Sequence, residues 1–304
     1  MKNKLHKDLD ALLKFFLKQR QNPPAEYTYG AGIVPRPEVF TRKDLQAHLN
    51  NPLLQPEWLA MVAGGKLLSL EPACLYKRVQ TKELQFIDKS YINQLLVEGA
   101  AVVLEGLDIL DPRINTFLAR IDESFPCVMS NCVAFFSQRE NEAYQGHCDT
   151  DDVLVLQLEG KKTWHIFEAQ QRRYRGAANQ SDEQLGPVKE EITMRPGDAM
   201  YVRAGVPHRC TTPGDYSLHF SIDLGDRTSN VEQITAQADS RYLYATAPVY
   251  GSLSQVVDTY VDILENPEFQ ASLQAETDNK RNNIKQFRQQ MGRAAAVNYF
   301  SKLK

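Results

Sequence analysis

Long hydrophobic runs are missing from the sequence, and none of its apolar stretches approaches the ~20 residues that a membrane-spanning helix needs. Five cysteines are an odd number and form no C-x-x-C pair, so they do not indicate a disulfide framework. The basic N-terminus has Lys14 and Lys18 within its apolar run and no small-residue cleavage site after it, which argues against a secretory signal. We therefore expect a soluble protein of the cytoplasm.

Charge of one sign is also lacking. The formal net charge of the 304 residues is -3, which gives no general reason to expect nucleic acid or a membrane surface as a partner. Hydrophobic residues make up 42% and charged residues 24%, values that are ordinary for a globular protein and supply enough material for a core. The length suits one large domain or two modest ones.

The first part of the chain has a mixed pattern. Apolar residues at helical spacing predict a helix over residues 5–20, and the Pro- and Gly-containing residues 22–40 read as a loop. Residues 41–49 and 90–98 fit short helices, whereas 66–76 and 100–107 read as strands. A further helix is expected from Asp111, as N-cap, and Pro112, in its first position.

From residue 127 to about 225 the pattern changes to short strands divided by turn residues. The predicted strand segments are 127–137, 153–160, 162–168, 190–205 and 216–224. Several strands at this spacing are typical of a sandwich or barrel. Helical patterns return over 252–269 and 279–300. We therefore predict a mainly β fold with flanking helices, divided into residues 1–96, 97–225 and 226–304.

The stretch GHCDTDDVLVLQLEG (146–160) places His147 and Asp149 one residue apart at the start of an apolar strand pattern. In a strand, side chains at i and i+2 point to the same side, so these two groups face together and Cys148 faces away. An imidazole and a carboxylate fixed side by side are two ligands for a divalent metal. The segment MRPGDAMYVRAGVPH supplies a third at His208, after a turn and a short strand.

Two histidines and one carboxylate form the facial triad of non-heme Fe(II) oxygenases, which leaves coordination positions open. An H-x-D pair alone is a weak signal, and a lone His208 is more often a hydrogen-bonded histidine at a strand start. The H-x-D, the Pro-Gly-Asp turn and the later Gly-x-Pro-His together, within a β-rich region, make a strong signal.

These segments closely resemble the JmjC-type cupin oxygenases, in particular the branch that includes the ribosomal-protein hydroxylases. The resemblance covers roughly residues 35–260. It implies a double-stranded β-helix, or jelly-roll, core with Fe(II) and 2-oxoglutarate, together with O2, and metal ligands at His147, Asp149 and His208. It also implies that the basic residue that binds the far carboxylate of 2-oxoglutarate is Lys162 and that the family's asparagine on the preceding strand is Asn131.

The physical argument for Lys162 is independent of the family. Gly160 allows a turn that resets which side of the strand faces inward, and a lysine that points into a jelly roll is a costly buried charge unless an anion meets it. The alternative is a solvated hairpin charge, which we prefer for Lys161. His219 and Ser221 share one strand face with Asp223, and the resemblance makes the first two candidates to contact 2-oxoglutarate; a buried structural histidine is the alternative.

The sequence therefore predicts an oxygenase that hydroxylates a side chain of a protein or peptide substrate and releases succinate and CO2. A small molecule or free amino acid is an alternative substrate, because only helical patterns follow residue 230 whereas ribosomal hydroxylases carry a C-terminal winged-helix domain. The pattern also leaves open a metal-binding cupin without oxygenase activity and a non-catalytic interaction protein. The apolar faces of the last helices suggest a homodimer, or packing on their own core.

Overall fold

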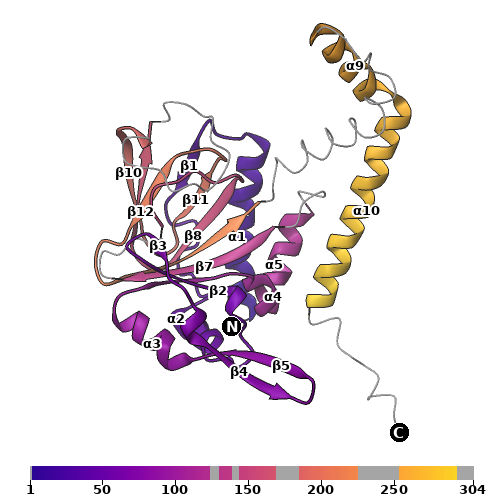
Figure 1. Cartoon of the computed structure of the whole chain (residues 1–304). Helices are drawn as coiled ribbons and strands as arrows, with labels where there is room; N and C mark the ends of the chain where they lie inside the picture. Colours follow the sequence, from indigo (N-terminus) through magenta and orange to yellow (C-terminus); the bar gives the residue numbers. More distant parts are fainter. Residues whose placement is uncertain (1, 124–129, 139–143, 169–184, 225–252, 293–304) are drawn as a thin grey trace. The chain divides into compact units, whose positions relative to one another are not determined.

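A computed structural model of the chain describes residues 2–123, 130–138, 144–168, 185–224 and 253–292. The chain divides into two compact units, of which the first comprises residues 1–118 and 130–224 and the second residues 119–129 and 225–304. The first unit holds the strands that the structure describes, and the second holds helices α9 and α10 (Figure 1). The three-region division expected from the sequence stays a prediction.

An eight-stranded antiparallel sheet forms the larger layer of the first unit. In spatial order its strands are β1 (Tyr27–Gly30), β11 (Ala199–Val202), β8 (Val153–Gly160), β13 (Tyr216–Asp223), β7 (Asn131–Gln138), β6 (Ala101–Leu104), β2 (Leu59–Ala63) and β3 (Lys66–Leu67). The central strands β8, β13 and β7 are the longest, at eight residues each. They come from the segments whose apolar patterns predicted strands.

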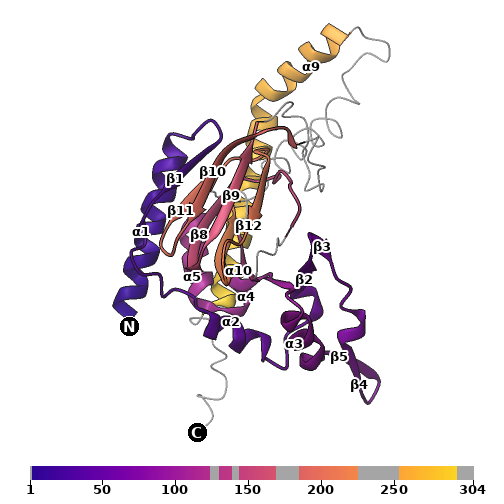
Figure 2. The same ribbon diagram turned by 90° about the vertical axis from the view of Figure 1, so that its left-hand side faces the viewer.

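A three-stranded sheet of β10 (Val188–Met194), β9 (Lys162–Phe167) and β12 (His208–Thr211) forms the second layer. Figure 2 shows it facing the β8 and β11 part of the larger sheet. Apolar side chains from both layers fill the space between them, and they include Val155 of β8, Trp164 of β9, Met194 of β10 and Met200 of β11. The predicted mainly β class with helices before and after the core is confirmed.

Helix α1 (Lys2–Gln21) occupies the segment where the apolar spacing predicted a helix. Leu12 and Phe16 on its apolar face are fully buried, and the ring centroid of Phe16 lies 6.4 Å from that of Tyr201 on β11. The helix therefore buries its apolar stripe against the outer side of the larger sheet, which explains why β8 and β11 are buried throughout most of their length.

Four short helices begin within the first unit. They are α2 (Arg42–Leu49), α3 (Lys89–Val97), α4 (Leu107–Leu110) and α5 (Pro112–Asp122), with single 3-10 turns at Pro56–Trp58 and Glu71–Ala73. Helices α2, α3 and α5 each begin at a side-chain cap. The Asp111 carboxylate accepts a hydrogen bond from the backbone N–H of Arg113 at 2.8 Å, as expected of an N-cap before Pro112. Thr41 and Asp44 form a capping box at the start of α2.

Two parts of the sequence interpretation were wrong. Residues 22–40 are not all loop, because Tyr27–Gly30 pairs with β11 as an edge strand. Residues 66–76 are not one strand: a 3-10 turn that contains Pro72 separates β3 from β4 (Cys74–Val79), which pairs with β5 (Lys82–Ile87) as a separate hairpin. In both places the pairing partner lies outside the segment, so local residue preference could not reveal it.

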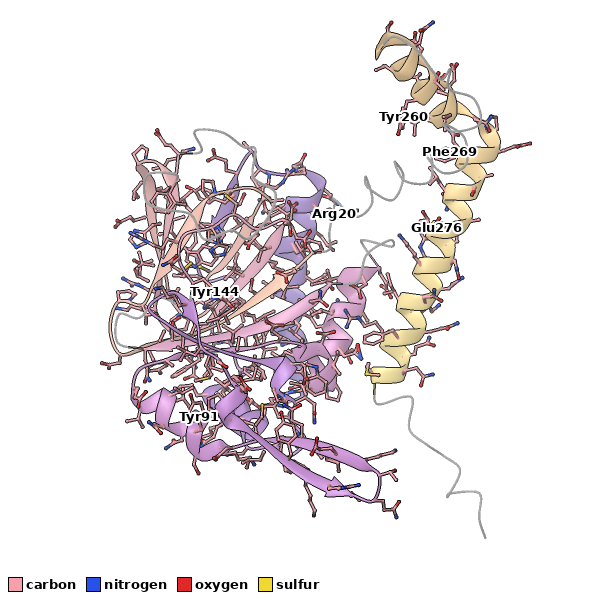
Figure 3. The ribbon with its side chains drawn as sticks, viewed as in Figure 1. Arg20, Tyr91, Tyr144, Tyr260, Phe269 and Glu276 are labelled. Carbon is pink, nitrogen blue, oxygen red and sulfur yellow. The ribbon has the colours of Figure 1, made fainter. Side chains whose placement is uncertain are left out.

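The second unit contains α9 (Leu253–Glu265) and α10 (Pro267–Met291), with Asn266 as the cap between them. Tyr260 and Ile263 of α9 pack with Phe269 and Leu273 of α10, and Figure 3 labels Tyr260 and Phe269. Residues 293–300, the end of the last predicted helix, lie outside the described residues, as does Cys127. None of the helices that the structure describes combines the length and apolar character of a membrane span.

Candidate active site

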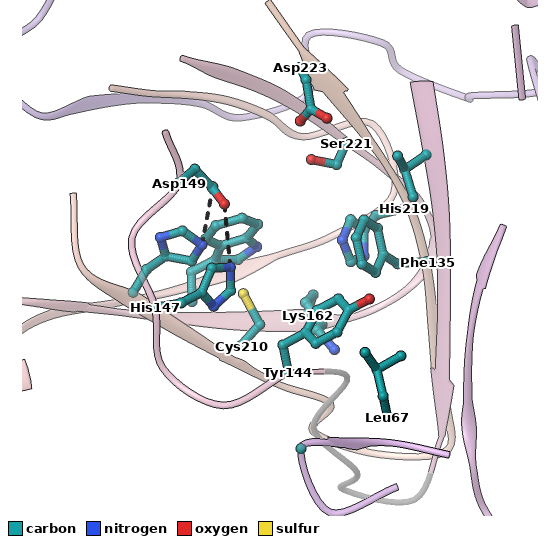
Figure 4. Close-up of a pocket in the computed structure, with 14 residues that line it drawn as sticks. Leu67, Phe135, Tyr144, His147, Asp149, Lys162, Cys210, His219, Ser221 and Asp223 are labelled. Carbon is teal, nitrogen blue, oxygen red and sulfur yellow. Dashed lines mark ion pairs between the residues drawn. The ribbon is translucent and has the colours of Figure 1, made fainter. Parts of the chain in front are cut away.

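A cavity of about 440 Å³ opens between the two sheets of the first unit. It is lined by Gly65, Leu67, Val133, Phe135, Tyr144, His147, Asp149, Lys162, Trp164, His208, Cys210, His219, Ser221 and Asp223. Six of the seven residues that the sequence singled out are in this set, and the exception is Asn131. His147 and Asp149 lie on one side of the cavity in Figure 4, with His219 and Phe135 across from them.

The two histidines are held together by the backbone. His147 and His208 form an antiparallel bridge in which each N–H donates to the other residue's carbonyl, at 3.0 and 2.9 Å. Nδ1 of His147 lies 2.8 Å from the carbonyl of Gln145, and Nδ1 of His208 lies 2.9 Å from the carbonyl of Val206. Both rings therefore have Nε2 available toward the cavity, the arrangement in which a histidine is oriented for a metal ion.

The Asp149 carboxylate lies between these two nitrogens. Its Oδ1 is 3.4 Å from Nε2 of His147, and its Oδ2 is 3.6 Å from Nε2 of His208 (Figure 4, dashed lines). One ligand atom from each of the three residues lies within 4.8 Å of the others, and this is the group of possible metal ligands found among the described residues. The H-x-D pair and the distant histidine thus meet in space.

The pKa shifts of Asp149 and His208 favour the protonation states that a metal requires. Burial lowers the pKa of His208 below its ordinary value, although the charge of Asp149 opposes this. Burial acts to raise the pKa of Asp149, but the charge of His208 and the hydrogen bond with His147 lower it overall. Burial acts to lower the pKa of His147, and the hydrogen bond and charge of Asp149 raise it overall. An ionised carboxylate and a neutral His208 are ready ligands.

Asp152 fixes the loop that carries two of these residues. Its buried carboxylate accepts hydrogen bonds from the hydroxyl of Tyr201 at 2.5 Å and the N–H of Ala204 at 3.0 Å, and Arg203 forms an ion pair with it at 3.3 Å. The N–H of Gly205 also donates to the carbonyl of Asp149 at 2.9 Å. Asp152 therefore links the H-x-D loop to the segment that leads to His208.

Lys162 lies at another side of the cavity and is fully buried. Its ammonium donates hydrogen bonds to the hydroxyls of Ser137 at 2.8 Å and Thr212 at 3.1 Å, and these two hydroxyls are 2.7 Å apart. Burying an ammonium costs free energy that hydroxyl partners offset in part. The inward direction expected of Lys162 is therefore what the structure shows, and its neighbour Lys161 is exposed.

Gly160 accounts for that direction. It has φ +66°, and a Cβ atom on it would lie 2.0 Å from the backbone oxygen of Tyr216 on β13. Only glycine fits both this conformation and this contact. Strand β8 therefore ends at Gly160, and β9 begins at Lys162 in the other sheet with a new alternation of side chains.

His219 and Trp164 each bring a buried nitrogen with no hydrogen-bond partner in the described structure, Nδ1 and Nε1 respectively. The ring of His219 stacks on Phe135 at 5.0 Å between centroids, and burial and the charge of Lys162 hold the pKa of His219 well below its ordinary value. His219 is therefore a neutral group beside a buried ammonium. Buried polar atoms without protein partners are typical of a cavity that binds a ligand.

Ser221 and Asp223 continue the cavity face of β13 beyond His219. Burial and the charges of Asp149, Asp151 and Glu105 raise the pKa of Asp223 to about 7. The sequence noted that Asp223 shares this strand face but did not include it in the site. Nothing in a single strand pattern reveals that three other carboxylates lie near it.

Asn131 is not brought into the cavity. It begins β7, is exposed, and faces the same side as Val133 and Phe135, which do line the cavity. The hydroxyl of Ser137, which Lys162 contacts, is six residues further along β7, or about 20 Å at the rise of a strand. Asn131 therefore lies at the opposite end of the strand from Ser137 and Lys162, and its role in binding the co-substrate stays a prediction.

Further lining residues were not predicted as site residues. Tyr144 lines the cavity and packs edge-on against both Phe135 and His147, with centroids 6.1 Å apart in each case. Trp164 also lines the cavity and stacks on His208 with ring centroids 5.0 Å apart, and Cys210 reaches the cavity as well. For Cys210 the signal was present, because it lies two residues after His208 in a strand and so points to the same side.

Comparisons with known proteins agree with this geometry. The family model of the JmjC domain matches residues 110–233. Among curated proteins, the chain is 25% identical over 171 residues to the bifunctional lysine-specific demethylase and histidyl-hydroxylase NO66 of Aedes aegypti, covering 55% of this chain and 25% of that protein. It is 28% identical over 122 residues to ribosomal oxygenase 2 of Bos taurus, covering 38% of this chain and 26% of that protein.

Solved structures support the fold. The X-ray structure of Escherichia coli YcfD aligns with a TM-score of 0.54 and 12% identity over 84% of this chain and 68% of that one. YcfD described as a ribosomal oxygenase in complex with cobalt and 2-oxoglutarate aligns with a TM-score of 0.52 and 13% identity over 86% of this chain and 70% of that one. The chain covers about a quarter of the length of the two curated relatives. The expected jelly-roll core and the resemblance to this branch are confirmed.

Proposed function

From the match of residues 110–233 to the JmjC domain model, we propose that the protein is an Fe(II)- and 2-oxoglutarate-dependent oxygenase. It would hydroxylate a side chain of a protein or peptide substrate and release succinate and CO2. The observation that carries this proposal is the convergence of His147, Asp149 and His208 in a cavity that also contains the buried ammonium of Lys162.

The donor set fits Fe(II). Two imidazole nitrogens and one carboxylate oxygen on one side of an ion leave its remaining positions facing the cavity, as in the 2-His-1-carboxylate triad. The backbone carbonyls of Gln145 and Val206 fix both rings through Nδ1, so Nε2 is the atom that His147 and His208 would present.

The opposite wall fits 2-oxoglutarate. A dicarboxylate needs a cation for the carboxylate that is distant from the metal, and Lys162 provides one in a place where water does not compete. The partnerless nitrogens of Trp164 and His219 lie on the same cavity, so a bound co-substrate would give them the hydrogen bonds that they lack. Ser221, next along the face of His219, is a further candidate contact.

Bound iron and 2-oxoglutarate would supply the means to insert one oxygen atom of O2 into an unactivated C–H bond. The protein's own contribution is position and exclusion. His147, Asp149 and His208 hold the metal, and Lys162 anchors the co-substrate. The aromatic rings of Phe135, Tyr144 and Trp164 form the walls that keep water from the centre.

A protein or peptide is the substrate class that the names of the relatives support, since they describe a histidyl-hydroxylase and ribosomal oxygenases. We propose the same class for this chain, without nucleic acid or membrane partners and in the cytoplasm. A free amino acid or other small molecule is the alternative, because a cavity of about 440 Å³ also accommodates a compound of that size beside the co-substrate.

A homodimer is proposed as well. Val257, Val261 and Leu264 of α9 are exposed apolar residues at helical spacing, so they form a stripe on one face of the helix. Sedimentation of the whole chain decides the question: a dimer that dissociates in the Val261→Lys variant supports the proposal, and a monomeric unmodified chain removes it.

Turnover of 2-oxoglutarate tests the oxygenase proposal. We expect the purified chain with Fe(II), ascorbate and 2-oxoglutarate to form succinate even without a substrate. The His208→Ala variant should lose at least about 1,000-fold of this rate, because the iron would lose one of its three protein ligands. Succinate is measured by mass spectrometry.

The matched control is His165→Ala, which removes a histidine from the same small sheet but from outside the cavity, where it contacts Glu191 and Thr211. It should keep most of the rate. Succinate formation by His208→Ala at the unmodified rate, or none by the unmodified chain, would refute the oxygenase assignment. A non-enzymatic metal-binding cupin would bind metal and form no succinate.

A further inference from the structure

We propose that Asp223 is the specificity-determining residue of the cavity and that the substrate group it binds is a cationic nitrogen, a guanidinium or an ammonium. This inference rests on the proposed oxygenase function, because it assigns the substrate end of the same cavity. It depends on the position of Asp223, its lack of partners and the balance of charge in the cavity.

Asp223 and Lys162 lie at opposite ends of the cavity. The ammonium of Lys162 is anchored at Ser137, which is paired with Ser217 near the start of β13. Asp223 ends β13, six residues after Ser217, which places it about 20 Å from the Lys162 end along the strand. Figure 4 shows Lys162 and Asp223 at opposite sides of the cavity, with Asp149 and His147 to one side between them. A small co-substrate bound to Lys162 and the metal therefore does not extend to Asp223.

Asp223 also lacks a protein partner. Among the residues that the structure describes, none donates a hydrogen bond to its carboxylate or forms an ion pair with it. The carboxylate is mostly shielded from water and has Asp149, Asp151 and Glu105 as its charged neighbours. A shielded carboxylate with only like charges around it is destabilised, and a bound cation would relieve this.

The charges of the loaded centre do not meet this need. Fe(II) contributes two positive charges and Lys162 one, whereas Asp149 contributes one negative charge and 2-oxoglutarate two, so these four groups cancel. The charge of Asp223 is outside this sum, and Asp151 and Glu105 add further negative charge near it. A positive group on a substrate side chain bound beside Asp223 would offset this charge.

Neighbouring residues suit a donor-rich group. Ser221 lies two residues before Asp223 on the same face, and its hydroxyl can accept a hydrogen bond. Asn131, which does not itself line the cavity, is the register partner of Asp223 on β7, so its side chain lies on the same face beside that of Asp223. Carboxylate, hydroxyl and amide oxygens together offer several acceptors for the N–H groups of one guanidinium or ammonium.

Binding of small probes to the whole chain tests the inference. The chain is loaded with Mn(II), which replaces iron and prevents turnover, and with 2-oxoglutarate. Calorimetry then measures the Kd of three capped amino acids: Nα-acetyl-arginine amide, Nα-acetyl-lysine amide and Nα-acetyl-citrulline amide, the neutral isostere of the first. We expect at least one cationic probe to bind at least about tenfold more tightly than the citrulline probe. The better cation identifies guanidinium or ammonium as the preferred group.

The Asp223→Asn variant should remove this preference, because it keeps the shape of the side chain and eliminates the charge. Asp215→Asn is the matched control: it is the same substitution at an exposed aspartate just before β13, and it should keep the full preference. A cooperative thermal unfolding transition in both variants rules out a general loss of structure. The comparison of arginine and citrulline on the unmodified chain needs no variant at all.

The outcomes separate the two proposals. If the chain binds neither Mn(II) nor 2-oxoglutarate, the oxygenase proposal fails and this inference fails with it. If both bind but citrulline binds as tightly as arginine and lysine, or if no cationic probe binds at millimolar concentration, only the role of Asp223 is overturned. A preference for cations that persists in Asp223→Asn overturns it equally.

Discussion

The two ends of the cavity carry opposite charges that are held in different ways. At one end the ammonium of Lys162 is fully buried and donates hydrogen bonds to Ser137 and Thr212. At the other end the carboxylate of Asp223 is partly exposed and accepts no hydrogen bond from the residues that the structure describes. The ammonium of Lys162 is thus oriented by protein hydrogen bonds before any ligand binds, whereas the carboxylate of Asp223 is not.

This difference separates two tasks. A group that every catalytic cycle must bind benefits from a charge that is already oriented, because less ordering remains to be done on binding. A group that distinguishes one substrate from another benefits from a charge that remains unfavourable until the right partner neutralises it. We therefore assign the invariant co-substrate to the Lys162 end and the selected side chain to the Asp223 end.

Removing the charge of Lys162 should have the largest effect on ligand binding. In Lys162→Met the apolar stem is retained, so the fold should remain, but the Kd for 2-oxoglutarate should rise by about 10- to 100-fold with the loss of a charge-assisted hydrogen bond. Calorimetry on the Mn(II)-loaded chain measures this. Lys161→Met is the control, since Lys161 is the exposed neighbour, and its Kd should not change. Equal affinities in the two variants would contradict the assignment of Lys162.

Substitution of Asp152 should show whether metal binding depends on the contacts that hold the loop with His147 and Asp149. Asp152→Asn weakens the hydrogen bonds from Tyr201 and Ala204 and the ion pair with Arg203, so the free energy of unfolding should fall by about 2 kcal/mol. The Mn(II) affinity should fall as well, because this loop carries Asp149. Urea unfolding and calorimetry measure the two effects.

Asp198→Asn provides the comparison for that loop variant. Asp198 is also buried, but it accepts hydrogen bonds from Tyr29, Gly32 and Arg195, which do not line the cavity. It should lose a similar amount of stability and keep its Mn(II) affinity. If Asp152→Asn binds Mn(II) as well as Asp198→Asn does, the positioning role of Asp152 is wrong.

The smallest effect concerns pH at the Asp223 end. The pKa of Asp223 is about 7 in the folded chain against an ordinary 3.8, so the folded state binds this proton more tightly than the unfolded state does. The stability that the proton contributes is complete below pH ~4 and is lost as the pH rises through ~7. In the metal-free chain, Asp223→Asn should therefore gain at least about 1 kcal/mol relative to the unmodified chain between pH 5 and pH 8.

Urea unfolding at a series of pH values measures this difference. The Asp215→Asn control should differ from the unmodified chain by the same amount at every pH, because Asp215 is exposed. A constant difference for Asp223→Asn would show that its carboxylate titrates like one in water. The contrast between the two ends of the cavity would then rest on Lys162 alone.

Those parts of the site that depend on alternation within one strand were predictable from the sequence. Alternation placed His147 beside Asp149, and the turn at Gly160 directed Lys162 inward. Alternation gives the side of a strand but not the depth along it. Asn131, which the family resemblance placed in the site, lies at the far end of β7 from Ser137 and outside the cavity lining. Pairing partners from distant segments, such as β1 on β11, have no local signal.

The bridge between His147 and His208 has a consequence for how the site would release its ion. Two backbone hydrogen bonds join these residues, and a carbonyl fixes each ring through Nδ1, so neither imidazole can turn away alone. The contacts of the Asp149 carboxylate are with the two rings themselves. Of the three ligand residues, Asp149 therefore has the side chain that is least restrained by the backbone. We expect dissociation of a bound ion to begin with rotation of this carboxylate, while the two paired rings keep their positions.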